Sequence, residues 1–281
     1  MAVLGNLPKQ PKLTWQEIVD AYAKDYDKYM KTPYPWQSYN SHEYREWLAA
    51  RKTVEQKSAQ RVQEAEFFKG VTFDEVENSV KKHLADGSLQ LRQGWAELFQ
   101  AVLKSNDSRI SIVSVNWSET SIRLTLLLAA RGLVLPEQDH IELTRYIQSM
   151  TINANEIAGL REPGGSSGQI CRLHGEDIRT SNDKLRYLPK PDESNVFVIY
   201  VGDSSTDFDC LVDADLGVWL CNVPESERQQ KFKDTFAPFD QSGFYPSPLA
   251  AIRRFEDATE LFYWSPDFEP LLRLFVADSQ A

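Results

Sequence analysis

Cysteine and histidine are scarce in this chain of 281 residues, which has three cysteines and four histidines. The cysteines are Cys171, Cys210 and Cys221, and the histidines are His42, His83, His140 and His174. The cysteines form no Cys-x-x-Cys pair and their number is odd, so a disulfide framework is not expected. The histidines lack the spacing of zinc ligands. We interpret all of these side chains as structural or surface residues.

Long apolar runs and an excess of positive charge are missing as well. No stretch approaches the roughly 20 apolar residues of a membrane-spanning helix, and the amino terminus lacks the basic start and apolar run of a signal peptide. The 41 acidic residues outnumber the 31 basic ones and give a net charge of -10, which argues against a surface for nucleic acid. The sequence predicts a cytoplasmic protein with neither membrane nor nucleic acid as a partner.

Helical patterns fill the first 105 residues. Capping boxes, in which a threonine is followed three residues later by a glutamate, begin at Thr14 and Thr72 and predict two helix starts. Residues 43–68 have the pattern of one long, charged, amphipathic helix. The apolar side chains of residues 95–103 mark a further buried helix face, so this part of the chain is expected to be a helical block.

From residue 109 the pattern changes to short apolar strands that alternate with helices, which is typical of βαβ units with a parallel sheet. We expect strands or extended segments at 110–115, 150–156, 196–203 and 216–220, and helices from Ser118 to Gly132, at 182–188, around 210–211, at 248–255 and at 266–275. Residues 162–168 have too many glycines for a helix or a central strand. They form no phosphate-binding P-loop, because no Lys-Ser or Lys-Thr follows the last glycine.

The most informative segment is the run from Val196 to Asp207, an apolar strand that ends in Gly202 and two carboxylates, Asp203 and Asp207. Such a strand is typical of a parallel sheet, whose carboxyl-terminal edge binds ligands. Two carboxylates there suit Mg²⁺, which keeps several waters and binds one or two carboxylates together with a substrate phosphate. The structural alternative is a helix N-cap with acidic residues that favour the helix dipole.

Two further polar residues fall at the ends of predicted sheet elements, in the chain order Ser114, Lys184, Asp203, Asp207. A serine at a strand end can donate a hydrogen bond to a phosphate oxygen, and a lysine can neutralise charge on a phosphoryl group. Neither Ser114 nor Lys184 is informative alone, since strand ends are rich in serine and most lysines are solvated. Their order along the chain is what points to a site.

Three segments resemble the haloacid dehalogenase superfamily of phosphohydrolases, specifically its fungal, phosphoserine phosphatase-like branch with a helical cap. They are Ile112–Ser118, Asn182–Leu185 and, most specifically, Val201–Leu211. The resemblance implies that Ser114, Asn116 and Lys184 bind a phosphorylated substrate and that Ser114, Lys184 and Asp207 form the catalytic site. It also implies that Asp203 and Asp207 bind Mg²⁺, with Asp207 supporting Lys184 as well.

The same resemblance implies an α/β fold with a Rossmann-like parallel sheet core and an α-helical cap domain. Residues 1–13 would be an N-terminal remnant of the core, residues 14–90 the helical cap, and residues 91–281 the core. By family analogy the chain begins about 25 to 30 residues late, because Met1–Gly5 is similar to the middle of the helix after the first motif. The sheet would then lack its first central strand and have two open strand edges.

The nucleophile motif of that family, Asp-x-Asp at the end of the first strand, is absent. Asp25-Tyr26-Asp27 has the spacing, but no apolar strand precedes it and it falls within a helical pattern. Asp207-Phe208-Asp209 also has the spacing but belongs to the later motif. Without the attacking aspartate, covalent turnover is not expected.

Two functions remain open from the sequence. The first is a Mg²⁺-dependent phosphomonoesterase for a small phosphorylated metabolite, inactive in this chain because the nucleophile is missing. The alternative is a non-catalytic binding or scaffolding protein that still holds phosphate through Ser114 and Lys184. A different reaction carried out by Lys184 and Asp203 is a third reading.

Overall fold

The computed structural model describes residues 11–32, 41–105, 107–172, 175–189, 196–236 and 243–278. The chain forms two compact units, each built from three stretches of sequence. Unit 1 comprises Met1–Thr32, Arg51–Leu91 and Arg109–Arg179, and unit 2 comprises Pro33–Ala50, Arg92–Ser108 and Thr180–Ala281. The predictions for Met1–Gly5 and His174 lie outside the described residues.

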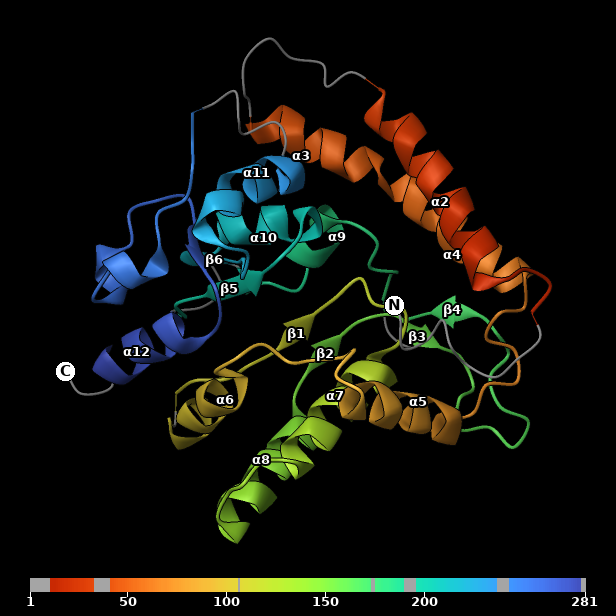
Figure 1. Ribbon diagram of the computed structural model, residues 1–281, viewed down its shortest axis with the longest axis horizontal. Helices are drawn as coiled ribbons and strands as arrows, with labels where there is room; N and C mark the ends of the chain where they lie inside the picture. Colours follow the sequence, from red (N-terminus) through yellow and green to blue (C-terminus); the bar gives the residue numbers. More distant parts are fainter. Residues whose placement is uncertain are drawn as a thin grey trace. The chain divides into compact units, whose positions relative to one another are not determined.

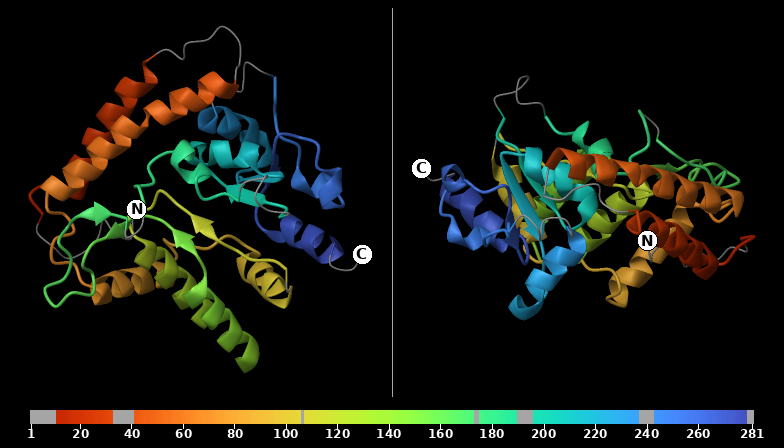
Figure 2. Two further views of the ribbon diagram at one scale, coloured as in Figure 1. Left: turned by 180° about the vertical axis from the view of Figure 1, so that it is seen from behind. Right: turned by 90° about the horizontal axis from the view of Figure 1, so that it is seen from above.

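Unit 1 combines helices with two small sheets (Figure 1). Its helices are α2 (Trp15–Met30), α4 (Lys52–Glu64), α5 (Phe73–Ala85), α7 (Glu119–Arg131) and α8 (Glu137–Ser149). Its strands are β1 (Ile112–Val113), β2 (Ile152–Asn153), β3 (Glu156–Ile157) and β4 (Ile170–Cys171). Strands β1 and β2 are parallel, whereas β3 and β4 are antiparallel. Helices α2 and α4 run side by side in Figure 1 and in both views of Figure 2.

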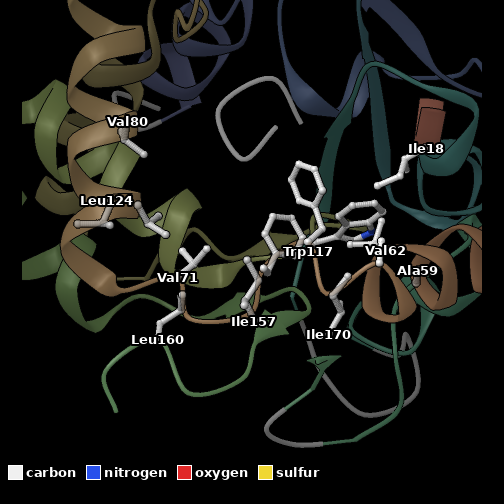
Figure 3. Packing of buried hydrophobic residues seen from close by; sticks show 14 residues of the cluster. Ile18, Ala59, Val62, Val71, Val80, Trp117, Leu124, Ile157, Leu160 and Ile170 are labelled. Atoms are coloured by element: carbon white, nitrogen blue, oxygen red, sulfur yellow. The ribbon is translucent and has the colours of Figure 1, made fainter. Parts of the chain in front are cut away.

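The core of unit 1 gathers around Trp117, which lies just before α7 (Figure 3). Its ring packs edge-on against Trp15 and Phe68, with centroid distances of 6.3 and 6.1 Å. Val62 of α4 and Ile157 of β3 belong to the same cluster and are fully buried. Burial of such apolar side chains is the dominant favourable term in folding.

Unit 2 contains the second parallel sheet, in the order β5-β6-β7. Its strands are β5 (Ile199–Gly202), β6 (Leu216–Leu220) and β7 (Tyr263–Ser265). Its helices are α3 (Ser41–Ala50), α6 (Trp95–Lys104), α9 (Ser181–Leu185), α10 (Phe208–Asp213), α11 (Glu225–Thr235) and α12 (Glu269–Asp278), with 3-10 turns η2 (Ser205–Asp207), η4 (Leu249–Ala251) and η5 (Phe255–Asp257).

The core of unit 2 is aromatic and packs against β6, whose five residues are all buried. Trp219 of β6 has no exposed surface and packs edge-on against Phe232 of α11 and against Phe236. Tyr44 of α3 contacts Phe208 of α10 with a centroid distance of 4.6 Å. A strand buried along its whole length explains the continuous apolar run at 216–220.

The structure confirms a mixed α/β fold with small parallel sheets. Both capping boxes are present, since Thr14 and Thr72 each accept a hydrogen bond from the backbone three residues later while that glutamate returns one. Ser118 caps α7, and Asp25-Tyr26-Asp27 lies within α2. Within the described residues, β1 pairs only with β2 and β5 is an edge strand. A missing central strand stays a prediction.

Two helix predictions are wrong. The expected helix over 43–68 is two helices, α3 and α4, and they belong to different units. The expected helix at 248–255 consists only of the short turns η4 and η5, because Pro248 is extended and Ile252 returns to an extended conformation.

The predicted division into a remnant (1–13), a helical cap (14–90) and a core (91–281) stays a prediction. The two compact units have other boundaries. Unit 2 includes Pro33–Ala50 from the helical block, and unit 1 includes Arg109–Arg179. None of the helices in the described ranges is long and apolar enough to span a membrane.

The glycine-rich segment 162–168 is a loop, as predicted, and it pairs with the turn around Gly70. The Gly70 N–H donates to the Ser166 carbonyl and the Ser166 N–H donates to the Val71 carbonyl, both at 2.7 Å. Gly165 has φ +74°, and a Cβ there would lie 2.5 Å from the Gly70 carbonyl oxygen. The loop therefore serves the fold of unit 1.

Replacing Gly165 by alanine should destabilise unit 1. A left-handed non-glycine residue costs on the order of 1 to 3 kcal/mol, and the backbone clash adds to that. Urea unfolding followed by circular dichroism should show a lower midpoint. Gly164→Ala is the matched control, because its Cβ would meet no atom within 4 Å. Equal loss in both variants would contradict the steric argument.

Candidate functional site

The predicted site segment folds as a strand, a turn and a helix within unit 2. Strand β5 ends at Gly202, the turn η2 follows, and α10 begins at Phe208. A Cβ on Gly202 would collide with the side chain of Asp207. Glycine at this position therefore lets the Asp207 carboxylate fold back against the end of the strand.

Asp207 is the centre of a hydrogen-bonded cluster of Lys184, Tyr200, Asp203, Ser204 and Asp207, which we call the Asp207 cluster. Its Oδ1 accepts from the Lys184 ammonium at 2.5 Å and from the Tyr200 hydroxyl at 2.7 Å. Its Oδ2 accepts from the Asp203 and Ser204 N–H groups at 3.2 and 3.1 Å, and from the Ser204 hydroxyl at 2.9 Å. Both oxygens are thus engaged by the protein itself.

These contacts shift the pKa values of Asp207 and Tyr200. Burial by itself raises the pKa of Asp207, but the Lys184 charge and the hydrogen bonds from Lys184, Tyr200 and Ser204 outweigh it, so the pKa lies below its usual range. Burial, and then the charge of Asp207, raises the pKa of Tyr200. Tyr200 is therefore a phenol that donates, and Asp207 is a carboxylate that accepts.

Lys184 reaches the cluster from the short helix α9. Thr180 and Asp183 form a capping box at its start, which fixes the first turn of that helix. The Lys184 side chain is only 5% exposed, and Asp207 is its one hydrogen-bond acceptor among the described residues. Since an ammonium has three donors, two of the Lys184 donors have no acceptor among the residues that the structure describes.

Asp203 differs from Asp207 in its exposure and its partner. Its side chain is 61% exposed, and its Oδ2 lies 3.6 Å from Nη2 of Arg92, a residue just before α6. At that distance the two side chains form an ion pair but no hydrogen bond. Arg92 was not predicted from the sequence, and nothing in the local pattern around residue 92 indicates the contact.

The cluster does not fit a magnesium site held by the protein alone. In the ranges that the structure describes, no three His, Cys, Asp or Glu side chains gather closely enough to hold a metal ion. Asp207 accepts five hydrogen bonds, and of the two carboxylates that follow β5 Asp203 is the exposed one. The prediction of Mg²⁺ bound by Asp203 and Asp207 stays a prediction, and these contacts favour the structural alternative for Asp207.

Ser114 and Asn116 belong to unit 1, in the turn between β1 and α7. The Ser114 Oγ accepts from the Asn116 N–H at 3.1 Å, and Asn116 Oδ1 accepts from the Ser118 N–H at 3.0 Å. The buried Asn155 donates to the Asn116 carbonyl and holds Ile178 through both of that residue's backbone groups. The structure thus brings Ser114 and Asn116 together in one turn, and separately brings Lys184 to Asp207.

A second buried carboxylate lies close by in sequence, at Asp209 of α10. Its side chain has no exposed surface, and its Oδ1 lies 3.4 Å from Nε of Arg45 on α3, while Arg45 also hydrogen-bonds Asp213. The Asp209 N–H donates to the Ser181 hydroxyl at 2.7 Å. Burial raises the pKa of Asp209 to about 6, although Ser181 and Arg45 oppose the shift.

Comparison with known proteins identifies two relatives by sequence. The chain is 22% identical to a CTO1 family protein of Schizosaccharomyces pombe, over 99% of this chain and 93% of that protein. It is 21% identical to the mitochondrial bifunctional TH2 protein of Arabidopsis thaliana, over 74% of this chain but only 31% of that protein. No family model and no solved structure matches the chain.

These findings overturn the predicted membership of the haloacid dehalogenase superfamily. No model of that family matches the chain, and its two relatives are a CTO1 family protein and a bifunctional TH2 protein. The inferences that rested on the resemblance, namely the fungal phosphatase branch, the missing nucleophile and the late start, lose their support with it. The Asp207 cluster itself is independent of that resemblance.

The raised pKa of Asp209 predicts a specific pH dependence of stability. Between about pH 4 and pH 6 the folded chain keeps a proton that the unfolded chain has lost, so the free energy of unfolding falls as pH rises. A shift of this size corresponds to about 3 kcal/mol. Asp209→Asn should remove this pH dependence, and at neutral pH it should unfold at a higher urea concentration than the parent.

Urea unfolding at several pH values measures the effect. Asp234→Asn is the control, since Asp234 is an exposed aspartate of α11, and that variant should keep the parent's pH dependence. If Asp209→Asn and the parent lose stability in parallel between pH 4 and pH 6, the carboxyl at 209 does not titrate as inferred.

Proposed function

We propose that the Asp207 cluster binds a small phosphorylated metabolite or free phosphate, without hydrolysing it. The observation that carries the proposal is Lys184, whose ammonium is almost fully buried although only one of its three donors has an acceptor in the described residues. A buried charged group with unfilled donors loses its hydration without full replacement. A phosphate group supplies several acceptor oxygens at once and offsets that loss.

The local charge balance supports an anion as the ligand. The chain carries a net charge of -10, but at this strand end Asp207 is paired with Lys184 and Asp203 with Arg92. The two carboxylates are therefore neutralised by their own cations. An incoming phosphate meets a site that is not negative overall, in contrast to the protein as a whole.

The same contacts favour binding over hydrolysis. Both oxygens of Asp207 accept hydrogen bonds from Lys184, Tyr200, Asp203 and Ser204, so neither is free to attack phosphorus. Asp203 is the one exposed carboxylate of the cluster, and its exposure is the feature that favours the alternative of a Mg²⁺-dependent phosphomonoesterase. A measurement of turnover distinguishes phosphate binding from phosphomonoesterase activity.

Titration of the full chain with inorganic phosphate, followed by calorimetry, should give saturable binding. Lys184→Met should abolish it, because the charge and the unfilled donors are lost together. Since Lys184→Met leaves Asp207 buried and unpaired, Lys184→Met/Asp207→Asn is prepared as well, to remove both charges. Lys231→Met is the control, because Lys231 is exposed on α11. Unchanged phosphate binding by the folded double variant would refute the proposal.

Incubation with an aryl phosphate and Mg²⁺ separates binding from hydrolysis. We expect no turnover above that of the Asp203→Asn variant. Turnover that Asp203→Asn abolishes would show instead that the chain is a phosphomonoesterase and that Asp203 takes part in the reaction.

A further inference from the structure

Backbone hydrogen bonds hold Arg92 and the residue that follows it. Its carbonyl accepts from the Trp95 N–H at 3.3 Å, and the Gln93 carbonyl accepts from the Phe268 N–H at 3.0 Å. Gly94 has φ +79°, and a Cβ there would lie 3.0 Å from the backbone nitrogen of Glu269. Residues 93 and 94 thus pack against the start of α12, which holds the backbone next to Arg92.

The Arg92 guanidinium has capacity for a second anion. Its Nη2 lies 3.6 Å from the Asp203 carboxylate, and among the described residues the other guanidinium nitrogens have no hydrogen-bond or ion-pair partner. The side chain is 32% exposed, so a ligand can approach it from solvent. A guanidinium is always charged and its planar fork matches the oxygens of a phosphate group.

We propose that Arg92 takes the part that a divalent cation plays in magnesium-dependent phosphate sites, so that phosphate binds here through Lys184 and Arg92 without Mg²⁺. This inference rests on the proposed function and deepens it. The two cations act at opposite ends of the same turn, Lys184 at Asp207 and Arg92 at Asp203. Each neutralises one carboxylate and has donors left for the ligand.

The Asp207 contacts explain why a metal is not the simpler solution. To ligate Mg²⁺, Asp207 would have to release Lys184 or Tyr200, both of which donate to its Oδ1. Releasing Lys184 leaves a buried ammonium without its counter-charge, which is strongly unfavourable. Asp203 alone offers one carboxylate, and that carboxylate already faces Arg92.

The test measures phosphate binding to the full chain by calorimetry, once with Mg²⁺ and once with EDTA. The parent should bind with the same affinity, within about twofold, in both conditions. Arg92→Gln should weaken binding about tenfold, as expected for losing one charge-assisted contact. Arg92→Lys should fall between the two, because it keeps the charge but not the fork.

Arg253→Gln is the matched control, since Arg253 is exposed in the same unit, and it should bind as the parent does. Circular dichroism confirms that each variant is folded. Parent binding that requires Mg²⁺, or Arg92→Gln binding at parent strength, would overturn the inference and leave the proposed function standing. Absence of phosphate binding by the parent in both conditions would instead refute the proposed function.

Discussion

The ion pair between Lys184 and Asp207 is the interaction on which the strand end of unit 2 depends. Both side chains are less than a tenth exposed, so the attraction between them offsets the hydration that each loses inside the protein. Through its second oxygen Asp207 also holds the N–H groups of Asp203 and Ser204, which shapes the turn after β5. One carboxylate therefore couples α9, β5 and η2, and the position of Asp203 follows from it.

Local sequence signals predicted local structure well. Thr14 and Thr72 were identified because a capping box needs only four consecutive residues. Helices α8 and α11 were not predicted, although each follows a proline, Pro136 or Pro224, and has acidic residues in its first turn. The break at Arg51 had no such signal. Arg51 has helical dihedral angles and makes no side-chain cap hydrogen bond, and α3 and α4 fall in different units.

The site shows the same limit. The pairing of Lys184 with Asp207 was predicted and is present at 2.5 Å. The ion pair of Arg92 with Asp203 was not, because it joins distant parts of the sequence through the packing of residues 92–94 on α12. Ser114 was chosen for its strand-end position, and its hydroxyl accepts a hydrogen bond within its own turn. Strand ends favour serine for this structural reason too.

The motif that suggested a phosphohydrolase has a sufficient explanation in folding. Asp207 lies three residues after Ser204 and four after Asp203, and at this spacing one of its carboxylate oxygens accepts from both N–H groups. This is the geometry of a capped turn. Gly202 is required because a Cβ would collide with that carboxylate. A glycine followed by two aspartates at this spacing therefore does not by itself imply a metal. What distinguishes a ligand site from a capped turn here is the pair of cations, Lys184 and Arg92, whose donors exceed the acceptors that the described residues supply.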